Sequence, residues 1–343
     1  MPKHSNLGLT ATCVALVLPG SPALAIDQAL IDAAKAEGKV VWYTSLVVNQ
    51  VVQPIVEGFE AEYGIEVEFA NAPWEETAFR IINEGQAGAV NGDVFDALPA
   101  YAAANAAGLV APYQPEAAAD YDATFKSPDG MWTAHIIQPT SPAVNTDQVD
   151  PADYPTSYED LLDPRWKGKM AWTTSPSAGG PPGFIGTVLT AMGEEDGMAY
   201  LRKLAEQDIA NIPSNQRVVL DRAVSGENPM VLSIYNYHVP ISQAKGAPVE
   251  WIKIEPMPAH VGLVALLKDS PHPNAGKLLI EYILSEAGEQ VQADAGYIPA
   301  NPNVEASAPG MIPGKDYQIN LVTPEVFEAN IGHWIEVYEE LFQ

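Results

Sequence analysis

The segment Lys39-Val40-Val41-Trp42-Tyr43-Thr44 decides the fold, because this unbroken run of β-branched and aromatic residues predicts a buried strand. A helix is expected before it, over residues 26–37, and Gly38 ends that helix. Another helix is expected after it, over residues 50–63, with apolar residues at helical spacing and Gly64 at its end. The chain therefore alternates between helix and strand from residue 26 onward.

The alternation continues through the first third of the chain. Further strands are expected at residues 65–70 and 93–95, and further helices at about 74–84 and at 100–107. Strands that alternate with helices at this spacing are typical of an open α/β sheet with mostly parallel strands. Because such sheets bind ligands at the carboxyl ends of their strands, we expect the loops 45–48, 71–75 and 96–99 to face a ligand.

A proline-rich stretch separates this series from a second one. Prolines at positions 139, 142, 151, 155 and 164 favour crossing strands and an exposed connector over a core. The second series is expected to have strands at 169–172, 230–234 and 249–254 and helices at 183–192, 196–207 and 217–225. Pro256-Met257-Pro258 is expected to form a second crossover, followed by a strand at 261–267 and a helix at 274–286.

The predicted fold class is therefore α/β with two lobes joined by two hinge crossovers, and with a ligand cleft between the lobes. Lobe 1 is expected to comprise residues 26–137 plus 258–343, and lobe 2 residues 138–257. Residues 1–25 are excluded from both lobes, because they are typical of a secretory signal peptide.

That N-terminal segment has a short polar start, an apolar run over residues 7–18, and Pro22-Ala23-Leu24-Ala25 with small residues at both recognition positions. We expect cleavage after Ala25 and export to the periplasm. The chain's one cysteine, Cys13, lies in this segment. A disulfide framework, a thiolate zinc site and an iron–sulfur cluster are excluded, because each needs at least two sulfur atoms.

Composition excludes further classes. The chain of 343 residues has 17 Lys+Arg and 44 Asp+Glu, a formal net charge of −27, so little material is left for a basic face that binds nucleic acid. No other stretch approaches the roughly 20 apolar residues of a transmembrane helix. An enzyme is not expected, because nucleophile-elbow, zinc-protease and Walker motifs are absent from the sequence and the histidines are scattered singly. A carboxylate-dependent exported hydrolase is the least favoured alternative.

Several segments resemble periplasmic solute-binding proteins of ABC importers. They are Glu37 to Ser45, Phe59 to Ile65, Asn91 to Phe95, Thr156 to Gly168, Ala244 to Val249 and Ala295 to Asn301. More narrowly, the chain is similar to the ferric-iron-binding branch, which also holds binders of phosphonates, sugar phosphates and small carboxylates. The resemblance implies a type II clamp that closes on a small solute and presents it to a membrane permease. It also implies a monomer without a cofactor.

Two polar segments of lobe 2 are candidate anion contacts. Thr174, Ser175 and Ser177 lie in a loop of small residues ahead of a helix that prolines open, where backbone N–H groups and hydroxyls can face an anion. An ordinary capped helix start is the alternative. Asn215 and Arg217 precede another short helix, and an arginine there can bind a carboxylate or phosphonate in a bidentate manner. Its alternative is a surface salt bridge.

An aromatic segment, Tyr235, Tyr237 and His238, follows a predicted strand of lobe 2. The resemblance places Tyr237 and His238 where iron-binding relatives have two adjacent tyrosines, whose phenolates Fe³⁺ stabilises strongly. Tyr235 offers a second phenol on the same strand face while the chain stays extended. The alternative is that these rings only pack across the hinge.

Lobe 1 offers an incomplete set of metal ligands. Ser45 follows the first strand, Trp74 and Glu75 the second and Asp96 the third, but the first loop holds no His, Asp or Glu. Under an iron-binding alternative, Glu75, Tyr235 and Tyr237 would hold Fe³⁺ as the transported ligand. The missing first-loop ligand and the Tyr-His pair favour a small organic anion, of carboxylate or phosphonate type, instead.

Overall fold

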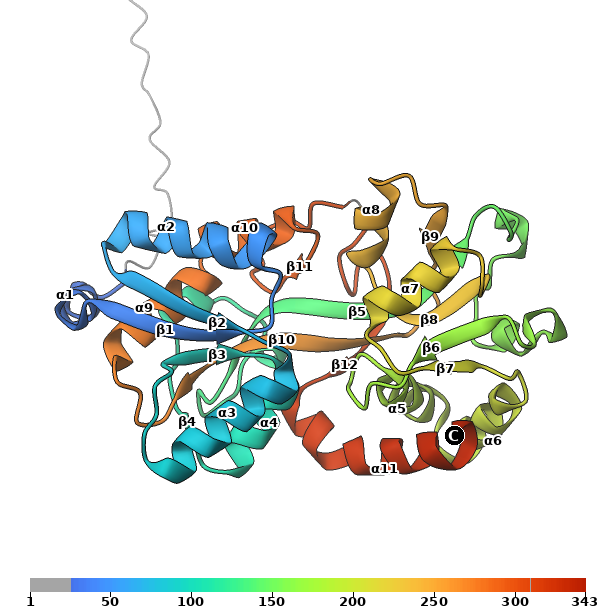
Figure 1. Ribbon diagram of the computed structural model, residues 1–343, viewed down its shortest axis with the longest axis horizontal. Helices are drawn as coiled ribbons and strands as arrows, with labels where there is room; N and C mark the ends of the chain where they lie inside the picture. The colour runs from blue at the N-terminus through green and yellow to red at the C-terminus, as the bar shows by residue number, and fades with distance from the viewer. Residues whose placement is uncertain (1–25, 309) are drawn as a thin grey trace, which may run out of the picture.

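The computed structural model describes residues 26–308 and 310–343, which form a mixed β-sheet flanked by helices (Figure 1). The main path of the sheet runs β2-β1-β3-β10-β5-β8-β6-β7 among these residues, and β4, β9, β11 and β12 pair off this path. The predicted alternation of helices and strands is confirmed. The expected signal peptide and Cys13 lie outside the described residues.

The first part of the chain forms the parallel edge of the sheet. Strand β1 (Lys39–Thr44) pairs in parallel with β2 (Glu66–Asn71) and β3 (Val94–Asp96). Helix α1 (Gln28–Glu37) precedes β1, α2 (Gln53–Tyr63) and α3 (Trp74–Ala87) lie between the strands, and α4 (Leu98–Ala106) follows β3, with a π-helical turn at Val48–Val52. Gly38 and Gly64 end α1 and α2 with φ of 79° and 69°, a backbone conformation that glycine adopts without strain.

The second series forms the other end of the sheet. Its strands are β6 (Met170–Thr173), β7 (Ala210–Ile212), β8 (Met230–Tyr235) and β9 (Val249–Trp251), and β6 is parallel to both β7 and β8. Its helices are α5 (Pro181–Met192), α6 (Glu194–Ala205), α7 (Gln216–Val224) and α8 (His238–Gln243). Helix α8 was not expected, and single 3₁₀ turns occupy Pro151–Asp153, Glu159–Leu162 and Pro164–Trp166.

One long strand, β5 (Thr133–Asn145), joins the two ends. It pairs with β10 (Met257–Leu267) up to Pro139 and with β8 from Thr140 onward. Nearly all of β5 is buried, so the expectation of an exposed connector is wrong for this part of the proline-rich stretch. Pro142 is tolerated because it lies at a register shift, where the strand lacks a regular ladder partner.

The chain then returns to the parallel edge and finally leaves it again. The returning elements are α9 (Pro273–Leu284), α10 (Glu286–Asp294), β11 (Ile298–Pro299) and β12 (Ile319–Val322). The short β4 (Val110–Ala111) and the 3₁₀ turns Glu116–Ala118 and Ala123–Phe125 come earlier in the chain, between α4 and β5. In Figure 1, α2 and α10 lie on one face of this half and α3 and α4 on the other.

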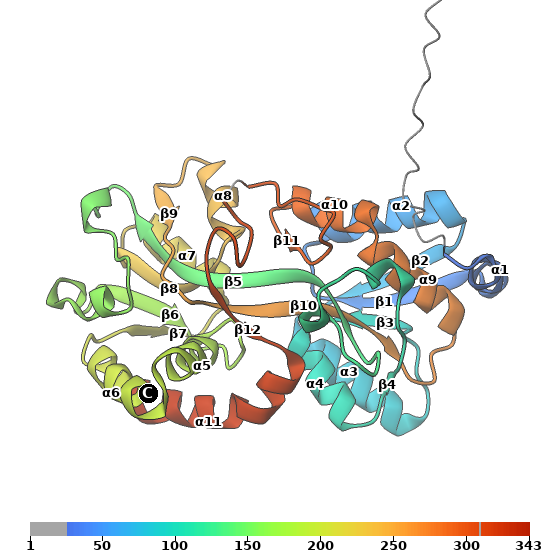
Figure 2. The same ribbon diagram turned by 180° about the vertical axis from the view of Figure 1, so that it is seen from behind.

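The last helix, α11 (Pro324–Phe342), runs beneath α5 and α6 (Figure 2). Phe342 packs against Trp172 of β6 with ring centroids 4.8 Å apart, and the Asn211 side chain of β7 donates a hydrogen bond to the Phe342 carbonyl oxygen. We infer from these contacts that α11 moves with lobe 2, although the sequence-based division placed it in lobe 1.

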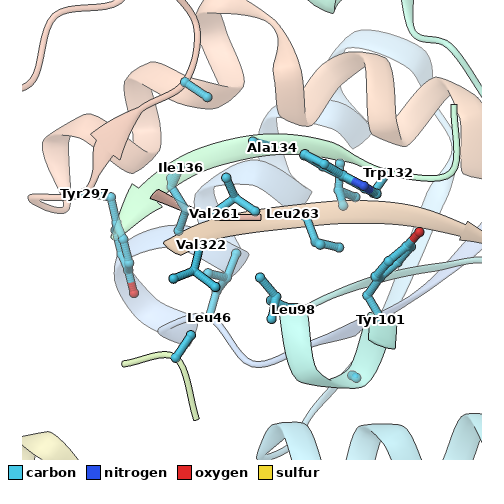
Figure 3. Close-up of a cluster of buried hydrophobic side chains, with 14 of the residues drawn as sticks. Leu46, Leu98, Tyr101, Trp132, Ala134, Ile136, Val261, Leu263, Tyr297 and Val322 are labelled. Carbon is cyan, nitrogen blue, oxygen red and sulfur yellow. The ribbon is translucent and has the colours of Figure 1, made fainter. Parts of the chain in front are cut away.

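The core of the parallel half lies against the two long strands. Side chains of β5 and β10, among them Ile136, Val261 and Leu263, meet Leu98 of α4 in one apolar cluster (Figure 3). Burying a side chain of this size contributes about 1.5–3 kcal/mol, so this cluster fixes the strand ends that carry polar residues. None of the helices in residues 26–308 and 310–343 combines the length and apolar character needed to cross a membrane.

Candidate functional site

Two adjoining cavities lie where the predicted loops of both halves meet. The inner cavity has a volume of about 180 Å³, and the outer cavity about 410 Å³. The inner cavity is lined by Ser45, Leu46, Trp74, Ala97, Leu98, Pro99, His135, Ile136, Gln138, Ser177, Ala178, Tyr235, Tyr237, His260, Gly262 and Tyr297. The outer cavity is lined by Pro73, Trp74, Glu75, Thr174, Ser175, Pro176, Ser177, Ser214, Asn215, Gln216 and Tyr235. Trp74, Ser177 and Tyr235 belong to both, so the two cavities form one cleft.

Parallel pairing of β1, β2 and β3 brings their carboxyl ends to one side of this cleft. Ser45 follows β1, and its N–H and hydroxyl donate hydrogen bonds to Oδ1 of Asp96 at 2.9 and 3.0 Å. Asp96 is buried behind the cavity wall, and burial raises the pKa of its carboxyl to about 6. The next residue, Ala97, lines the inner cavity with a φ of 83°, an uncommon conformation for a residue with a Cβ.

The loop between β6 and α5 forms the opposite wall, and its small residues are required by close packing. A Cβ on Gly179 would collide with the hydroxyl of Tyr235, and one on Gly180 or Gly183 would collide with a backbone carbonyl of the same loop. The loop therefore wraps tightly against Tyr235 ahead of α5. Gln216 pins it from the side by donating a hydrogen bond of 2.9 Å to the Gly179 carbonyl.

The same loop presents hydrogen-bond donors to the cleft. Within the described part of the chain, the backbone N–H groups of Ser177, Ala178 and Gly179 have no hydrogen-bond acceptor. Ser177 and Ala178 line the inner cavity, and the Ser175 and Ser177 hydroxyls lie 3.1 Å apart. Free N–H groups next to a helix N-terminus can hold negative charge.

Three tyrosines stack along the inner cavity. The ring centroids of Tyr235 and Tyr237 are 5.5 Å apart, and the two rings are nearly parallel. The ring centroid of Tyr237 lies 4.4 Å from that of Tyr297 in the opposite half. Burial raises the pKa of Tyr235 and of Tyr237 well above the usual value, and that of Tyr297 to about 12. All three phenols are therefore neutral at pH 7 in the absence of a metal ion.

Two histidines of the long strands complete the inner wall. His135 of β5 and His260 of β10 are 1% and 8% exposed, and burial lowers the pKa of each to about 4. Each keeps one buried ring nitrogen, Nε2 of His135 and Nδ1 of His260, without a hydrogen-bond partner among the described residues. No Lys or Arg of the described chain belongs to the lining of either cavity, and Glu75 of the outer cavity is the one acidic side chain in the two linings.

Comparison with known proteins decides the family. A family model of bacterial extracellular solute-binding proteins matches residues 93–319, which is most of the chain. The chain belongs to this family. The match also confirms the expected resemblance to periplasmic solute-binding proteins of ABC importers, and it describes a binding protein without a cofactor, not an enzyme.

Relatives of this solute-binding protein support the same assignment. An Fe(3+)-binding periplasmic protein of Serratia marcescens is 25% identical over 310 residues, covering 88% of this chain and 89% of its own. Iron-bound HitA from Pseudomonas aeruginosa has a TM-score of 0.75 at 22% identity, over 89% and 99% of the two chains. The periplasmic binding protein AfuA from Actinobacillus pleuropneumoniae, with exogenous fructose-6-phosphate bound, has a TM-score of 0.72 at 21% identity, over 88% and 99%. The predicted two-lobe clamp fold is thereby confirmed.

Most of the predicted site residues of the solute-binding protein meet in the cleft. Those lining a cavity are Ser45, Trp74, Glu75, Thr174, Ser175, Ser177, Asn215, Tyr235 and Tyr237. Asp96 lies just behind the wall. Asn215 also caps α7, because its side-chain oxygen accepts a hydrogen bond from the Val218 N–H at 3.1 Å.

Arg217 and His238 line neither cavity. The Arg217 guanidinium is bound to Asp221 at 2.8 Å and to the Ser242 hydroxyl, which ties α7 to α8. This is the salt bridge that the sequence left open as the alternative. His238 packs edge-on against Tyr237 with centroids 4.6 Å apart, and burial lowers its pKa to about 3.

The sequence did not indicate His135, Gln138, His260 and Tyr297 as site residues. Tyr297 lies in a segment that carried the family resemblance, which is the one signal that pointed near it. The two histidines come together only through the antiparallel pairing of β5 and β10. Within residues 26–308 and 310–343, no three His, Cys, Asp or Glu side chains are placed to hold a metal ion together.

Proposed function

We propose that this solute-binding protein captures a small anionic organic solute, of carboxylate or phosphonate type, in the periplasm and delivers it to an ABC permease. The observation that carries the proposal is the set of free N–H groups at Ser177 and Ala178 on the cleft wall, with that of Gly179 next to them in the same loop. Oriented N–H dipoles at a helix start balance negative charge without a cationic side chain.

Closure of the two lobes supplies the mechanism of capture. The loop before α5 contributes the donors from one half, and Ser45, Trp74 and Tyr297 contribute contacts from the other. A solute that touches both walls stabilises the closed state, and therefore shifts the population toward it. We also propose that the protein works as a monomer, after export and cleavage behind Ala25.

Calorimetry on purified protein tests the proposal against a panel of small carboxylates and phosphonates. Replacing Ser177 by Ala removes one hydroxyl donor to the anion, so binding should weaken by about 1.5–3 kcal/mol, or roughly 10- to 150-fold. Ser225→Ala at the far end of α7, outside both cavities, is the matched control and should bind as the wild type does. Equal binding by wild type and Ser177→Ala would remove the Ser177 hydroxyl from the site, and absence of binding by every acid of the panel would overturn the anion proposal.

Iron is the second candidate, because Tyr235 and Tyr237 line the same inner cavity and the Serratia marcescens relative is an Fe(3+)-binding protein. Glu75 at the outer cavity would supply a carboxylate. Native mass spectrometry before and after mild denaturation separates the two candidates by the mass that is lost. Loss of one iron, with a visible phenolate band that Tyr237→Phe abolishes, would replace the organic anion by Fe³⁺.

A further inference from the structure

His135 differs from the other polar residues of the inner cavity because its tautomer is fixed. Its Nδ1 faces Oε1 of Gln292 in α10, and a carboxamide oxygen can only accept a hydrogen bond. The Gln292 Nε2 faces the carbonyl oxygens of Ile283 and Gly288, both at 3.4 Å, which sets the orientation of this amide. Nδ1 of His135 therefore carries the proton.

A neutral imidazole with its proton on Nδ1 has a bare lone pair on Nε2. This Nε2 is the nitrogen that is buried without a partner, in a side chain that is 1% exposed and lines the inner cavity. Leaving a buried acceptor unpaired costs free energy, so the site is built for a group that donates a hydrogen bond there. Near pH 7 the ring is neutral, because burial lowers the pKa of His135 to about 4. Nε2 therefore stays a hydrogen-bond acceptor at this pH.

A plain carboxylate, or a phosphonate in its dianionic form, offers only acceptors, and these are matched by the N–H groups at Ser177 and Ala178 on the other wall. A second, uncharged group must therefore face His135. We infer that the solute is a hydroxylated acid, whose hydroxyl donates a hydrogen bond to Nε2 of His135 while its anionic end lies at the loop before α5. This inference rests on the proposed function and narrows it to hydroxy-carboxylates or hydroxy-phosphonates.

Matched acids that differ by one hydroxyl test the inference. Calorimetry would compare glycerate and lactate with propionate, and hydroxymethylphosphonate with methylphosphonate. We expect the wild type to bind the hydroxylated member of a pair at least about tenfold more tightly, because a site built to pair a hydroxyl rejects the analogue without it. In His135→Phe, the hydroxylated acid should fall to the affinity of the plain acid, whose own affinity should not change.

The outcomes separate this inference from the proposed function. Equal binding of both members of every pair to the wild type, or a preference that survives in His135→Phe, would overturn the inference and leave the organic anion in place. Binding of none of these acids, together with release of an iron mass, would overturn both.

A measurement without the variant covers the case in which His135→Phe does not fold. Nitrogen-15 NMR of the imidazole rings distinguishes a bare from a hydrogen-bonded ring nitrogen. Nε2 of His135 should be bare in the free protein and should shift on addition of glycerate but not of propionate. A nitrogen that is already protonated, or one that responds equally to both acids, would overturn the inference.

Discussion

At the residue scale, buried titratable groups of opposite kind lie around one cleft. Asp96 and His260 are both buried, and burial shifts the pKa of each in the direction that favours its neutral form, to about 6 for Asp96 and about 4 for His260. The same desolvation therefore raises the pKa of the acid and lowers that of the base. Among the described residues, no Asp, Glu, Lys or Arg lines the inner cavity, which makes its N–H dipoles and phenols the main polar contacts for a solute there.

Two conservative variants should change the pH dependence of stability in opposite directions. The folded pKa of Asp96, about 6, lies above the unfolded value of about 3.9, so Asp96 costs stability as pH rises from about 4 to 6. Asp96→Asn should therefore gain stability relative to the wild type across this interval. The folded pKa of His260, about 4, lies below the unfolded value of about 6.5, so wild-type stability should rise from about pH 4 to 6.5 relative to His260→Gln.

Urea unfolding of the three proteins between pH 4 and pH 8 measures these differences. The relative free energy of unfolding should change by up to about 1.4 kcal/mol for each unit of pH inside the interval. If the free energy of unfolding of a variant ran parallel to that of the wild type over the pH range, or if both differences changed with pH in the same direction, the opposite pKa shifts of Asp96 and His260 would be contradicted.

At the element scale, the C-terminal helix α11 packs against α5 of lobe 2. Gly186 of α5 lies directly against the ring of Trp334, so that a Cβ at this position would overlap the indole. Trp334 is 4% exposed, and the helix is held further along by Phe342 against Trp172. The absence of a side chain at Gly186 is what allows the two helices to approach.

Gly186→Val should force α11 away from α5 and destabilise the protein by about 1–3 kcal/mol, the usual cost of overpacking. Gly332→Ala is the matched control, because Gly332 lies in α11 with open space around it, and it should stabilise by about 0.5–1 kcal/mol. Thermal unfolding measures both changes. In Gly186→Val, the rate of amide hydrogen exchange should increase along α11 before it increases in α9. The reverse order would indicate that α11 belongs to lobe 1.

Much of this element arrangement could be predicted from the sequence, because α1 and α2 carry their own end signals in Gly38 and Gly64. Local signals fail where tertiary contacts decide. Strand β5 carries prolines that indicate a connector, yet its pairing with β8 and β10 buries it. The loops of the cleft could be predicted because they follow recognisable strands, whereas His135 and His260 become neighbours only after two distant strands pair.

At the scale of the whole molecule, negative charge is the dominant electrostatic feature. The chain carries a formal net charge of −27, and salt bridges pair only some of its acidic side chains in the described residues. Repulsion among the remaining carboxylates acts against the compact state. Exposed charges further apart than about 10 Å are largely screened at 0.1 M salt.

Raising NaCl from 50 to 500 mM should therefore stabilise the protein, with a rise of roughly 2–4 °C in Tm for each kcal/mol gained by screening. Differential scanning calorimetry at pH 7 measures this rise. The same series with Glu195→Gln, which removes an exposed acidic charge that forms no salt bridge among the described residues, should show a smaller dependence. A Tm that falls with salt would mean that attractive ion pairs outweigh the repulsion.

The passage of β5 through both halves restricts how the molecule can move. It pairs with β10 up to Pro139 and with β8 from Thr140 onward, so sliding one half along the strand would break the hydrogen bonds of one of the two ladders. Sliding of one half past the other is therefore unfavourable. Bending and twisting of the few residues around Thr140 and Ser141 leave the hydrogen bonds of both ladders in place. We therefore expect opening and closing to be mainly a change of the angle between the two halves about this segment.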